Sequence, residues 1–497
     1  MPEQPTVRTA DGTVQGRWDQ GSAVFRGIPY AQPPVGALRF AAPVPPRPWT
    51  GTRQATEFGP AVPQSGPIRA RTGEDTDWLT LNVSTPDLGS AGLPVLVWIH
   101  GGGYLAGTAA DPMYDPTRLS AAGLVVVSLN YRVGAEGFAL LDGAPPNRGL
   151  LDQLAALEWV QRNIASFGGN PQHVTVAGQS AGAGSIAALL TMAPARGLFR
   201  RAITHSVPGN FCTRALAEEV ATALADRLGA APTAAALAEV APDRLAEALT
   251  SFSADLPARY ARWGRLAQTG VAVCPVLDGD VLAETPWVAL THGRATGTEL
   301  LVGHTRDEFR LFSVMAGRAG GFTDEEARTA LDLFAPAPDG PRRYRAAAPQ
   351  ATPSELLETV YSDALFRMPS LHLARANAAG GGTSFLFELC LVAPAMGGAL
   401  GACHSIDVPL AFSSWDSPTA RDLFGDPPAP EARAVSQELH QAWIRFATTG
   451  TPGWAAHRPD RRLTRVLDTT STTVPYPEQH SHRIWENHLP TPFGLSG

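Results

Sequence analysis

The sequence predicts an α/β protein built on a large, mostly parallel sheet that helices flank on both faces. Near-continuous apolar runs at 94–99 and 124–129 are typical of strands buried on both faces. Segments with helical periodicity alternate with such runs along the chain. The pentapeptide Gly178-Gln179-Ser180-Ala181-Gly182 stands directly between a strand-like run at 173–177 and a helical one. These three observations favour an open sheet with a site at the ends of its strands.

The other expected elements follow the same alternation. Two strand-like runs at 6–9 and 12–16 meet at Asp11-Gly12, a turn typical of a β-hairpin. From 150 to 164, leucine, valine and isoleucine recur at spacings of three and four, which predicts a helix. Further strands are expected at 174–176, 300–303 and 385–389, and a further helix at 181–191.

The 497 residues suit one large domain, and we expect residues 1–497 to form a single unit. Two stretches, about 211–265 and 320–380, are helical in pattern and interrupt the strand rhythm. The second contains a capping box, with Thr323 as N-cap and Glu326 reaching back to it. Because no linker or internal repeat sets them apart, we expect helical excursions that cover the site.

Composition and charge exclude several classes of function. The net charge is −7 without an acidic or basic block, so neither nucleic acid nor a membrane surface is expected as a partner. All 39 basic residues are arginine, which excludes a lysine nucleophile. The N-terminus is polar and no apolar run approaches about 18 residues, so we expect a soluble, cytoplasmic protein.

The four cysteines are widely spaced and form no metal-binding pattern. A chain of this length with so few cysteines does not have a disulfide framework. We expect them to be small buried hydrophobes, and we expect neither a metal nor a cofactor. They are Cys212, Cys274, Cys390 and Cys403.

The serine between glycines predicts a nucleophile elbow. On a sharp strand-to-helix turn the hydroxyl of Ser180 would stand clear of the sheet, where it can attack a substrate. A Cβ at either flanking glycine would crowd such a turn. The pattern occurs once in a chain with 49 glycines, and its place between a strand and a helix favours a catalytic serine over a chance glycine-rich turn.

A run of three glycines, 101–103, follows the apolar strand that ends at Ile99. Ester hydrolysis passes through a tetrahedral oxyanion, which oriented backbone N–H groups can stabilise. Glycines let the backbone approach a substrate without intervening side chains. The expected donors are the amides of Gly102, Gly103 and Ala181.

A serine nucleophile needs a base and a group that orients the base. In this architecture the chain order is serine, acid, histidine, which favours His404 on a loop after a late strand. Other histidines in that order lie in helical or tail sequence and are weaker candidates: His372, His440, His480, His482 and His488. Asp307 and Glu308 both follow the strand at 300–303, and their residue types do not choose between them as the acid.

Motifs over nearly the whole chain resemble those of the type-B carboxylesterase family, which includes bacterial p-nitrobenzyl esterases and the cholinesterases. They lie at 25–31 (FRGIPYA), 38–40 (LRF), 79–83 (LTLNV), 100–104 (HGGGY), 130–132 (NYR), 147–153 (NRGLLDQ), 163–171 (NIASFGGNP), 178–182 (GQSAG), 199–203 (FRRAI), 307–308 (DE) and 401–404 (GACH). The resemblance implies an α/β-hydrolase fold and a triad of Ser180, Glu308 and His404. It also implies that Ser206 supports the acid from behind.

Four positions depart from the family pattern. Gln179 stands where relatives usually have glutamate, and Trp78 where secreted members have a paired cysteine. Phe309 and Ser405 replace the glycines that follow the acid and the base. No reacting group is lost. The missing glutamate weakens a negative field that would favour cationic substrates. The segment from Gln64 to Glu74 also has no aromatic residue to match the cholinesterase choline site.

The expected activity is therefore hydrolysis of neutral, hydrophobic or aromatic carboxylic esters through a serine acyl-enzyme. The alternatives are a carbamate or amide hydrolase with the same triad and a non-catalytic, adhesion-type member of the fold. The expected partner is a small-molecule ester, and a monomer is favoured. Apolar candidates for lining the pocket, for each of which ordinary core packing is an equal explanation, are Tyr104, Phe309, Phe312, Met315 and Phe322.

Overall fold

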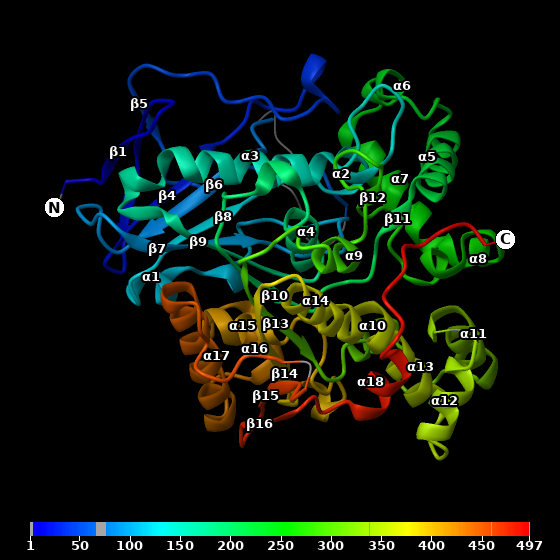
Figure 1. Cartoon of the computed structure of the whole chain (residues 1–497). Helices are drawn as coiled ribbons and strands as arrows, with labels where there is room; N and C mark the ends of the chain where they lie inside the picture. Colours follow the sequence, from blue (N-terminus) through cyan, green and yellow to red (C-terminus); the bar gives the residue numbers. More distant parts are fainter. Residues whose placement is uncertain (1–2, 66–75, 337, 459, 497) are drawn as a thin grey trace.

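A computed structural model describes residues 3–65, 76–336, 338–458 and 460–496 (Figure 1). Its centre is an eleven-stranded sheet in the order β16-β15-β14-β13-β10-β9-β7-β8-β6-β4-β3. The strands from β8 to β15 pair in parallel, whereas both ends of the sheet are antiparallel. The prediction of an α/β fold with a mostly parallel centre is confirmed.

Five of the eleven strands of the central sheet, β7, β8, β9, β13 and β14, coincide with predicted strand-like runs, and the other six were not predicted from the sequence. The eleven strands are β3 (Arg17–Asp19), β4 (Ser22–Pro29), β6 (Thr80–Thr85), β7 (Leu93–Ile99), β8 (Val125–Leu129), β9 (Gly169–Gln179), β10 (Arg201–His205), β13 (Glu299–Thr305), β14 (Thr383–Leu389), β15 (Leu463–Leu467) and β16 (Thr472–Pro475). The predicted hairpin is β1 (Thr6–Arg8) and β2 (Thr13–Gln15), which form a small sheet with β5 (Thr52–Gln54).

Helices cover both faces of the sheet because its central strands are apolar on both sides. Alternate residues of β7 belong to two different cores. Val95, Val97 and Ile99 share a cluster with α3 (Arg148–Asn163), α4 (Ala181–Leu189) and α14 (Met368–Ala379). Leu96 and Trp98 pack with α1 (Thr117–Ala121), α15 (Asp407–Phe412) and α17 (Pro430–Thr449). Successive side chains of a strand point to opposite faces of the sheet, so alternate residues of β7 pack against different helical layers.

The two segments at about 211–265 and 320–380 are largely helical. The first contains α5 (Arg214–Leu228), α6 (Ala234–Ala238), α7 (Pro242–Ala254) and α8 (Tyr260–Trp263), and the second contains α11 (Asp324–Phe334), α12 (Gly340–Ala347), α13 (Pro353–Ser362) and α14. Both lie toward the same end of the molecule in Figure 1. The capping box of Thr323 and Glu326 is present at the start of α11.

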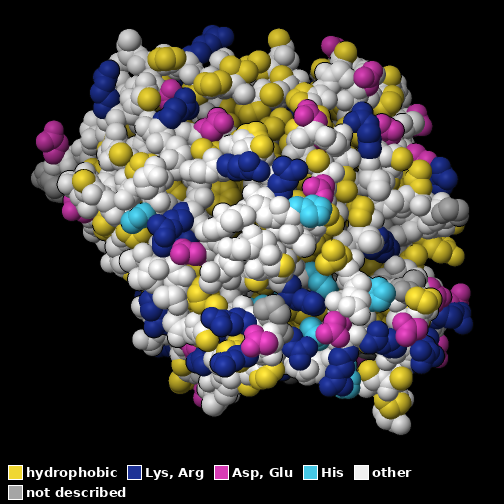
Figure 2. Space-filling view, in the orientation of Figure 1, with side chains coloured by type: hydrophobic (Ala, Val, Ile, Leu, Met, Phe, Trp, Pro, Cys, Tyr) yellow, Lys and Arg dark blue, Asp and Glu magenta, His cyan; other side chains and the backbone are white. Residues whose placement is uncertain are grey.

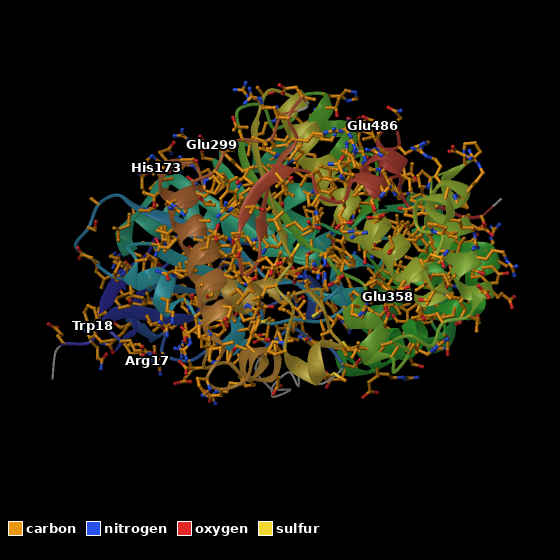
Figure 3. All side chains as sticks on the ribbon, turned by 90° about the horizontal axis from the view of Figure 1, so that it is seen from below. Arg17, Trp18, His173, Glu299, Glu358 and Glu486 are labelled. Carbon is orange, nitrogen blue, oxygen red and sulfur yellow. The ribbon has the colours of Figure 1, made fainter. Side chains whose placement is uncertain are left out.

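The remaining elements are short. They are α2 (Gly134–Phe138), β11 (Cys212–Thr213), β12 (Val276–Leu277), α9 (Pro286–Thr291), α10 (Arg310–Met315), α16 (Pro418–Phe424) and α18 (Gln479–Trp485). In Figure 3, Trp18 marks the edge strand β3 at the left of the view, and Glu358 of α13 lies to the right of the centre. The Nε of Arg310 donates to a carboxylate oxygen of Glu358 at 2.6 Å, which ties α10 to α13.

Surface charge is mixed in sign. Arginine and acidic side chains are interspersed over the face drawn in Figure 2, without a large block of either. Among the helices of the described residues, none combines the length and apolar character needed to span a membrane.

Candidate active site

Ser180 occupies a sharp turn between β9 and α4. Its backbone is strained, with φ 54° and ψ −126°, and its N–H donates to the carbonyl of His205 at 2.9 Å. A Cβ on Gly182 would lie 2.1 Å from the carbonyl oxygen of Ile99, and one on Gly178 would lie 2.8 Å from the backbone of Gly182. Both flanking positions therefore require glycine, because any side chain there would collide with the backbone, as expected from the sequence. The Ser180 hydroxyl makes no hydrogen bond within the described residues, and the residue is partly exposed in a pocket.

The structure brings His404 and Glu308 together. Nδ1 of His404 donates to a carboxylate oxygen of Glu308 at 2.5 Å, and both side chains are buried. This hydrogen bond sets the tautomer with an unprotonated Nε2, the nitrogen a general base uses. The rings of Phe312 and Phe366 pack against the imidazole with centroids 5.4 and 4.4 Å away. His404 is therefore fixed in orientation and partly shielded from solvent.

The second oxygen of Glu308 is held by two donors. The hydroxyl of Ser206 donates to it at 2.6 Å and the backbone N–H of Thr305 at 2.9 Å. Hydrogen bonds to an ionised carboxylate are stronger than those between neutral groups. The carboxylate is thus bound on both oxygens, which fixes the direction in which it faces His404.

Asp307, the other candidate acid, has a different place. One of its carboxylate oxygens accepts from the backbone N–H of Ala402 at 2.9 Å, and its own N–H donates to the Ala402 carbonyl at 2.9 Å. A Cβ on Gly401 would lie 2.6 Å from that carboxylate. Asp307 therefore holds the loop that carries His404 by hydrogen bonds to its backbone, while its neighbour Glu308 contacts the imidazole.

Gln179, which precedes the serine, contacts the same histidine. Its side-chain nitrogen lies 3.1 Å from Nε2 of His404, and the residue is buried. An amide N–H can donate to the lone pair of a neutral imidazole. Gln179 therefore occupies the hydrogen-bonding position of the base in the ligand-free chain.

The glycine loop after β7 has the conformation that its composition predicts. Gly102 and Gly103 have φ of 112° and 63°, and a Cβ on Gly102 would lie 1.9 Å from the carbonyl oxygen of Ala106. The amides of Gly102 and Gly103 donate to no acceptor within the described residues. Ala181 is the first residue of α4, where amides have no partner inside the helix. All three predicted donor residues line the pocket with Ser180.

Side chains outside the predicted set hold this loop. The side chain of Gln64 forms two hydrogen bonds with the backbone of Gly107, at 2.8 and 2.9 Å. The hydroxyl of Tyr131 donates to the carbonyl of His100 at 2.8 Å, and the two rings stack. Burial lowers the pKa of His100 to about 4, so its ring is neutral at physiological pH. Gln64 lies 43 residues from Gly107 in the sequence, and no local pattern indicates the contact.

The pocket above Ser180 has a volume of about 290 Å³. Its lining comes from residues that follow strands of the central sheet, from the segment just after the first excursion and from one turn of the second excursion: Gly102, Gly103, Tyr104, Gln179, Ser180, Ala181, Pro208, Asn210, Thr269, Val271, Phe309, Phe312, Leu365, Phe366, His404 and Ser405. None of these is an aspartate, glutamate or arginine. An apolar pocket with a few convergent polar groups is typical of small-molecule sites.

Three of the five predicted pocket residues line this cavity, and two do not. Tyr104, Phe309 and Phe312 are in the lining, but Met315 and Phe322 are not. Met315 is on the outer side of α10 and 77% exposed. Phe322 packs under the guanidinium of Arg318, 4.7 Å from its ring centroid. Both residues were predicted because they are apolar, and this property does not show whether a side chain faces the pocket or another side of its segment.

The walls that the sequence missed come from distant segments. Pro208 and Asn210 follow β10, Thr269 and Val271 lie just after the first excursion, and Leu365 and Phe366 lie in a π-helical turn at Asp363–Arg367. Pro208 and Asn210 could have been predicted, because they lie just after a strand of the sheet, where sites gather in open α/β folds. The other four had none, because their residue types are those of ordinary core positions.

The remaining histidines are held elsewhere. His372 is buried in α14, and Nδ1 of His440 binds the carbonyl of Ala411. Neither these two nor His480, His482 and His488 line the pocket. His205 forms a second histidine–carboxylate pair, with Nδ1 2.8 Å from Asp407. The indole N–H of Trp443 donates to Nε2 of His205 at 3.0 Å, so this nitrogen is not available to a substrate.

The sequence has no aromatic residue between Gln64 and Glu74. Of this segment, residues 66–74 lie outside the described residues.

Known carboxylesterases and related hydrolases are similar to this chain over nearly its whole length. The model of the carboxylesterase family matches residues 3–480. The para-nitrobenzyl esterase of Bacillus subtilis (strain 168) is 34% identical, over 96% of this chain and 97% of the relative. The phenmedipham hydrolase of Pseudarthrobacter oxydans is 35% identical, over 95% and 97%. The crystal structure of a Geobacillus stearothermophilus carboxylesterase at pH 6.2 superposes with a TM-score of 0.86 at 32% identity, covering 97% of this chain and 99% of that one.

Proposed function

The chain belongs to the carboxylesterase family and hydrolyses carboxylic esters, and we propose that it does so with Ser180 as nucleophile, His404 as base and Glu308 as the acid that orients the base. The observation that carries this assignment is the 2.5 Å contact of Glu308 with His404 in a pocket shared by His404 and Ser180. A buried carboxylate stabilises the imidazolium that forms when the base takes a proton.

In the acylation step, Ser180 Oγ attacks the ester carbonyl carbon while Nε2 of His404 takes the hydroxyl proton. The amides of Gly102, Gly103 and Ala181 bind the oxyanion. His404 then returns the proton to the departing alkoxide, which leaves as an alcohol. Water repeats the sequence on the acyl-enzyme and releases the acid. The Ser180–His404 hydrogen bond forms when substrate displaces Gln179 from Nε2, since such contacts often tighten only in the complex.

The substrate we propose is a neutral ester with a hydrophobic or aromatic group. The pocket lining contains no carboxylate or guanidinium, so it offers no partner for a charged substrate. Phe309, Phe312, Leu365 and Phe366 supply apolar surface beside the base. Its volume of about 290 Å³ lies at the lower end for ligand pockets, which favours a small ester.

A fluorophosphonate probe tests the assignment of the nucleophile. The probe should label Ser180 of the folded wild-type chain, and Ser180→Ala should lose both the label and the turnover of p-nitrophenyl acetate. Circular dichroism shows whether the variant is folded. Full activity of pure, folded Ser180→Ala would overturn the assignment.

A carbamate is the second candidate substrate. The phenmedipham hydrolase is 35% identical over nearly the whole chain, and the same triad can attack a carbamate carbonyl. A panel of p-nitrophenyl esters, aryl diesters, aryl carbamates and choline esters separates the candidates by kcat/KM. We expect neutral aryl esters to be fastest. A higher kcat/KM for carbamates would favour the second candidate.

The non-catalytic alternative is set aside, because the family and the relatives above are enzymes by name. A cytoplasmic location and a monomeric state stay predictions. Cell fractionation tests the first and light scattering of the purified chain tests the second.

A further inference from the structure

Two of the four cysteines touch each other, although 62 residues separate them in the sequence. The sulfur atoms of Cys212 and Cys274 are 2.9 Å apart, and both residues are buried. Cys212 is the first residue of β11, and Cys274 lies two residues before β12, its parallel partner. The N–H of Cys212 donates to the carbonyl of Pro275 at 2.9 Å. The two backbones are therefore already joined within one residue of Cys274.

The pair stands at the root of the first helical excursion. The chain between the two cysteines contains α5, α6, α7 and α8, and β11 and β12 lie where this group leaves the body of the molecule (Figure 1). Each cysteine also adjoins a pocket wall. Asn210 lies two residues before Cys212, and Val271 lies three residues before Cys274. A bond between the sulfurs would join these two walls covalently.

We propose that Cys212 and Cys274 form a disulfide bond that closes the first excursion into a covalent loop when a disulfide oxidant such as oxidised glutathione is present. The thiolate of one cysteine attacks a sulfur of oxidised glutathione and releases one reduced glutathione. The second cysteine, as thiolate, attacks the resulting mixed disulfide and releases another. Two S–H bonds are lost, one Sγ–Sγ bond forms, and the glutathione disulfide is reduced to two thiols.

Burial governs when this exchange takes place. It raises the pKa of the Cys274 thiol well above its ordinary value, so little thiolate exists in the closed fold. The exchange therefore proceeds during folding or through local opening of the excursion, and it is slow in the closed protein. Once formed, the bond restricts the unfolded chain over 62 residues and stabilises the fold. Cys390 and Cys403 are also buried, and no contact joins either to another cysteine in the described residues.

Peptide mapping of the full chain tests the proposal. The purified protein is incubated with oxidised glutathione, alone and in a urea concentration below the unfolding transition. Free thiols are alkylated after denaturation, and the chain is digested without reduction. We expect a cross-linked peptide that contains Cys212 and Cys274 and disappears with dithiothreitol, while Cys390 and Cys403 carry the alkyl label. Absence of this peptide in both arms, or glutathione adducts on the two cysteines in its place, would overturn the proposal.

Thermal unfolding supplies a second measurement. The oxidised chain should have a Tm about 5 °C above that of the reduced chain, because the cross-link closes a long loop. The difference should vanish with dithiothreitol. Cys212→Ala should show no oxidation-dependent shift, and Cys390→Ala, the matched control, should retain it. An equal shift in Cys212→Ala, or a cross-linked chain with an unchanged Tm, would contradict the covalent closure of the excursion. Because the mapping uses wild-type protein, a variant that fails to fold does not affect it.

Discussion

The side-chain nitrogen of Gln179 lies 3.1 Å from Nε2 of His404, while Nδ1 of the same ring donates to Glu308 at 2.5 Å. Both ring nitrogens thus have partners that match a neutral imidazole with its proton on Nδ1. Gln179 directly precedes Ser180, so the elbow itself delivers this amide to the base. An amide there holds the ring without adding charge.

Replacing Gln179 by glutamate should therefore change how the activity depends on pH. A carboxylate beside Nε2 stabilises the imidazolium, so His404 becomes available as a base only at higher pH. For Gln179→Glu the acidic limb of the kcat/KM profile should move to higher pH, with activity at pH 6 reduced more than activity at pH 9. The profile is measured with p-nitrophenyl acetate. Gln172→Glu, on the exposed start of β9, is the matched control and should leave it unchanged.

The same substitution should alter the choice between substrates. The new negative charge attracts a cationic group, so kcat/KM for a choline ester should rise relative to that for a neutral ester of similar size. An unchanged ratio together with an unchanged pH profile would show that position 179 has no electrostatic influence on the site.

Ser206 acts on the base through the acid. Its hydroxyl donates to Glu308 at 2.6 Å, and without it one carboxylate oxygen retains only the Thr305 amide. Because hydrogen bonds to charged groups contribute about 1.5–3 kcal/mol, Ser206→Ala should lower kcat roughly ten- to a hundredfold with little change in KM. Steady-state kinetics and the pH profile measure this.

Ser436→Ala is the control for that variant. Ser436 is buried and hydrogen-bonded to Leu410 and Ser413, away from the pocket. Its loss should lower stability but leave kcat intact. Equal losses of kcat in both variants would mean that Ser206 matters only for folding.

Phe312 and Met315 test the pocket wall within one short helix. The ring of Phe312 lies 5.4 Å from that of His404 and stacks near Phe366, whereas Met315 points away from the cavity. Phe312→Ala should raise KM for a phenyl ester about tenfold, since an aromatic contact contributes about 0.5–1.5 kcal/mol beyond its buried area. KM for ethyl acetate should change less. Met315→Ala should alter neither, and an equal effect of both variants would remove Phe312 from the wall.

The sequence predicts the framework because each of its signals is local. A strand buried on both faces must be apolar throughout, and β7 and β8 are. The elbow needs glycines within two residues of Ser180, where Cβ atoms would meet backbone. Such constraints fall on neighbouring positions, so they appear as short patterns in the sequence.

Local sequence signals do not choose between Asp307 and Glu308 as the acid. Both follow β13, and their residue types do not separate them; the family resemblance names Glu308, and in the fold the position of the His404 loop does so. In the fold, the Asp307 carboxylate binds the amide of Ala402 and Glu308 reaches the imidazole. The contact of Cys212 with Cys274 is similar in kind, because it arises from the pairing of two short strands on either side of an excursion. Tertiary contacts of this type leave no periodicity in the chain.

Glu388, on β14, is a buried carboxyl group with an unusual environment. It is fully buried, and neither carboxyl oxygen has a hydrogen-bond partner within the described residues. Burial raises its pKa to about 8, with Glu478 adding to the shift and Arg367 and Arg306 opposing it. Nδ1 of His304 lies 3.9 Å from it. The folded chain therefore keeps a proton on Glu388 at neutral pH.

This proton couples stability to pH. Below about pH 4.3, the ordinary pKa of glutamate, the folded and unfolded states are both protonated at this position. As pH rises toward 8, the unfolded chain releases the proton and the folded chain does not, so the contribution of Glu388 to stability is progressively lost. Glu388→Gln has no proton to lose. Relative to wild type, its free energy of unfolding should therefore be higher at pH 8 than at pH 5, by on the order of 3.5 kcal/mol.

Thermal and urea unfolding of both proteins at pH 5 and pH 8 measure this difference. Glu158→Gln, on the exposed side of α3, is the matched control and should differ from wild type by the same small amount at both pH values. Comparison at equal pH cancels the titration of groups that both proteins share. If the difference between Glu388→Gln and wild type is the same at pH 5 and pH 8, Glu388 is ionised in the fold throughout this range, and its charge must be balanced by Arg367 and Arg306.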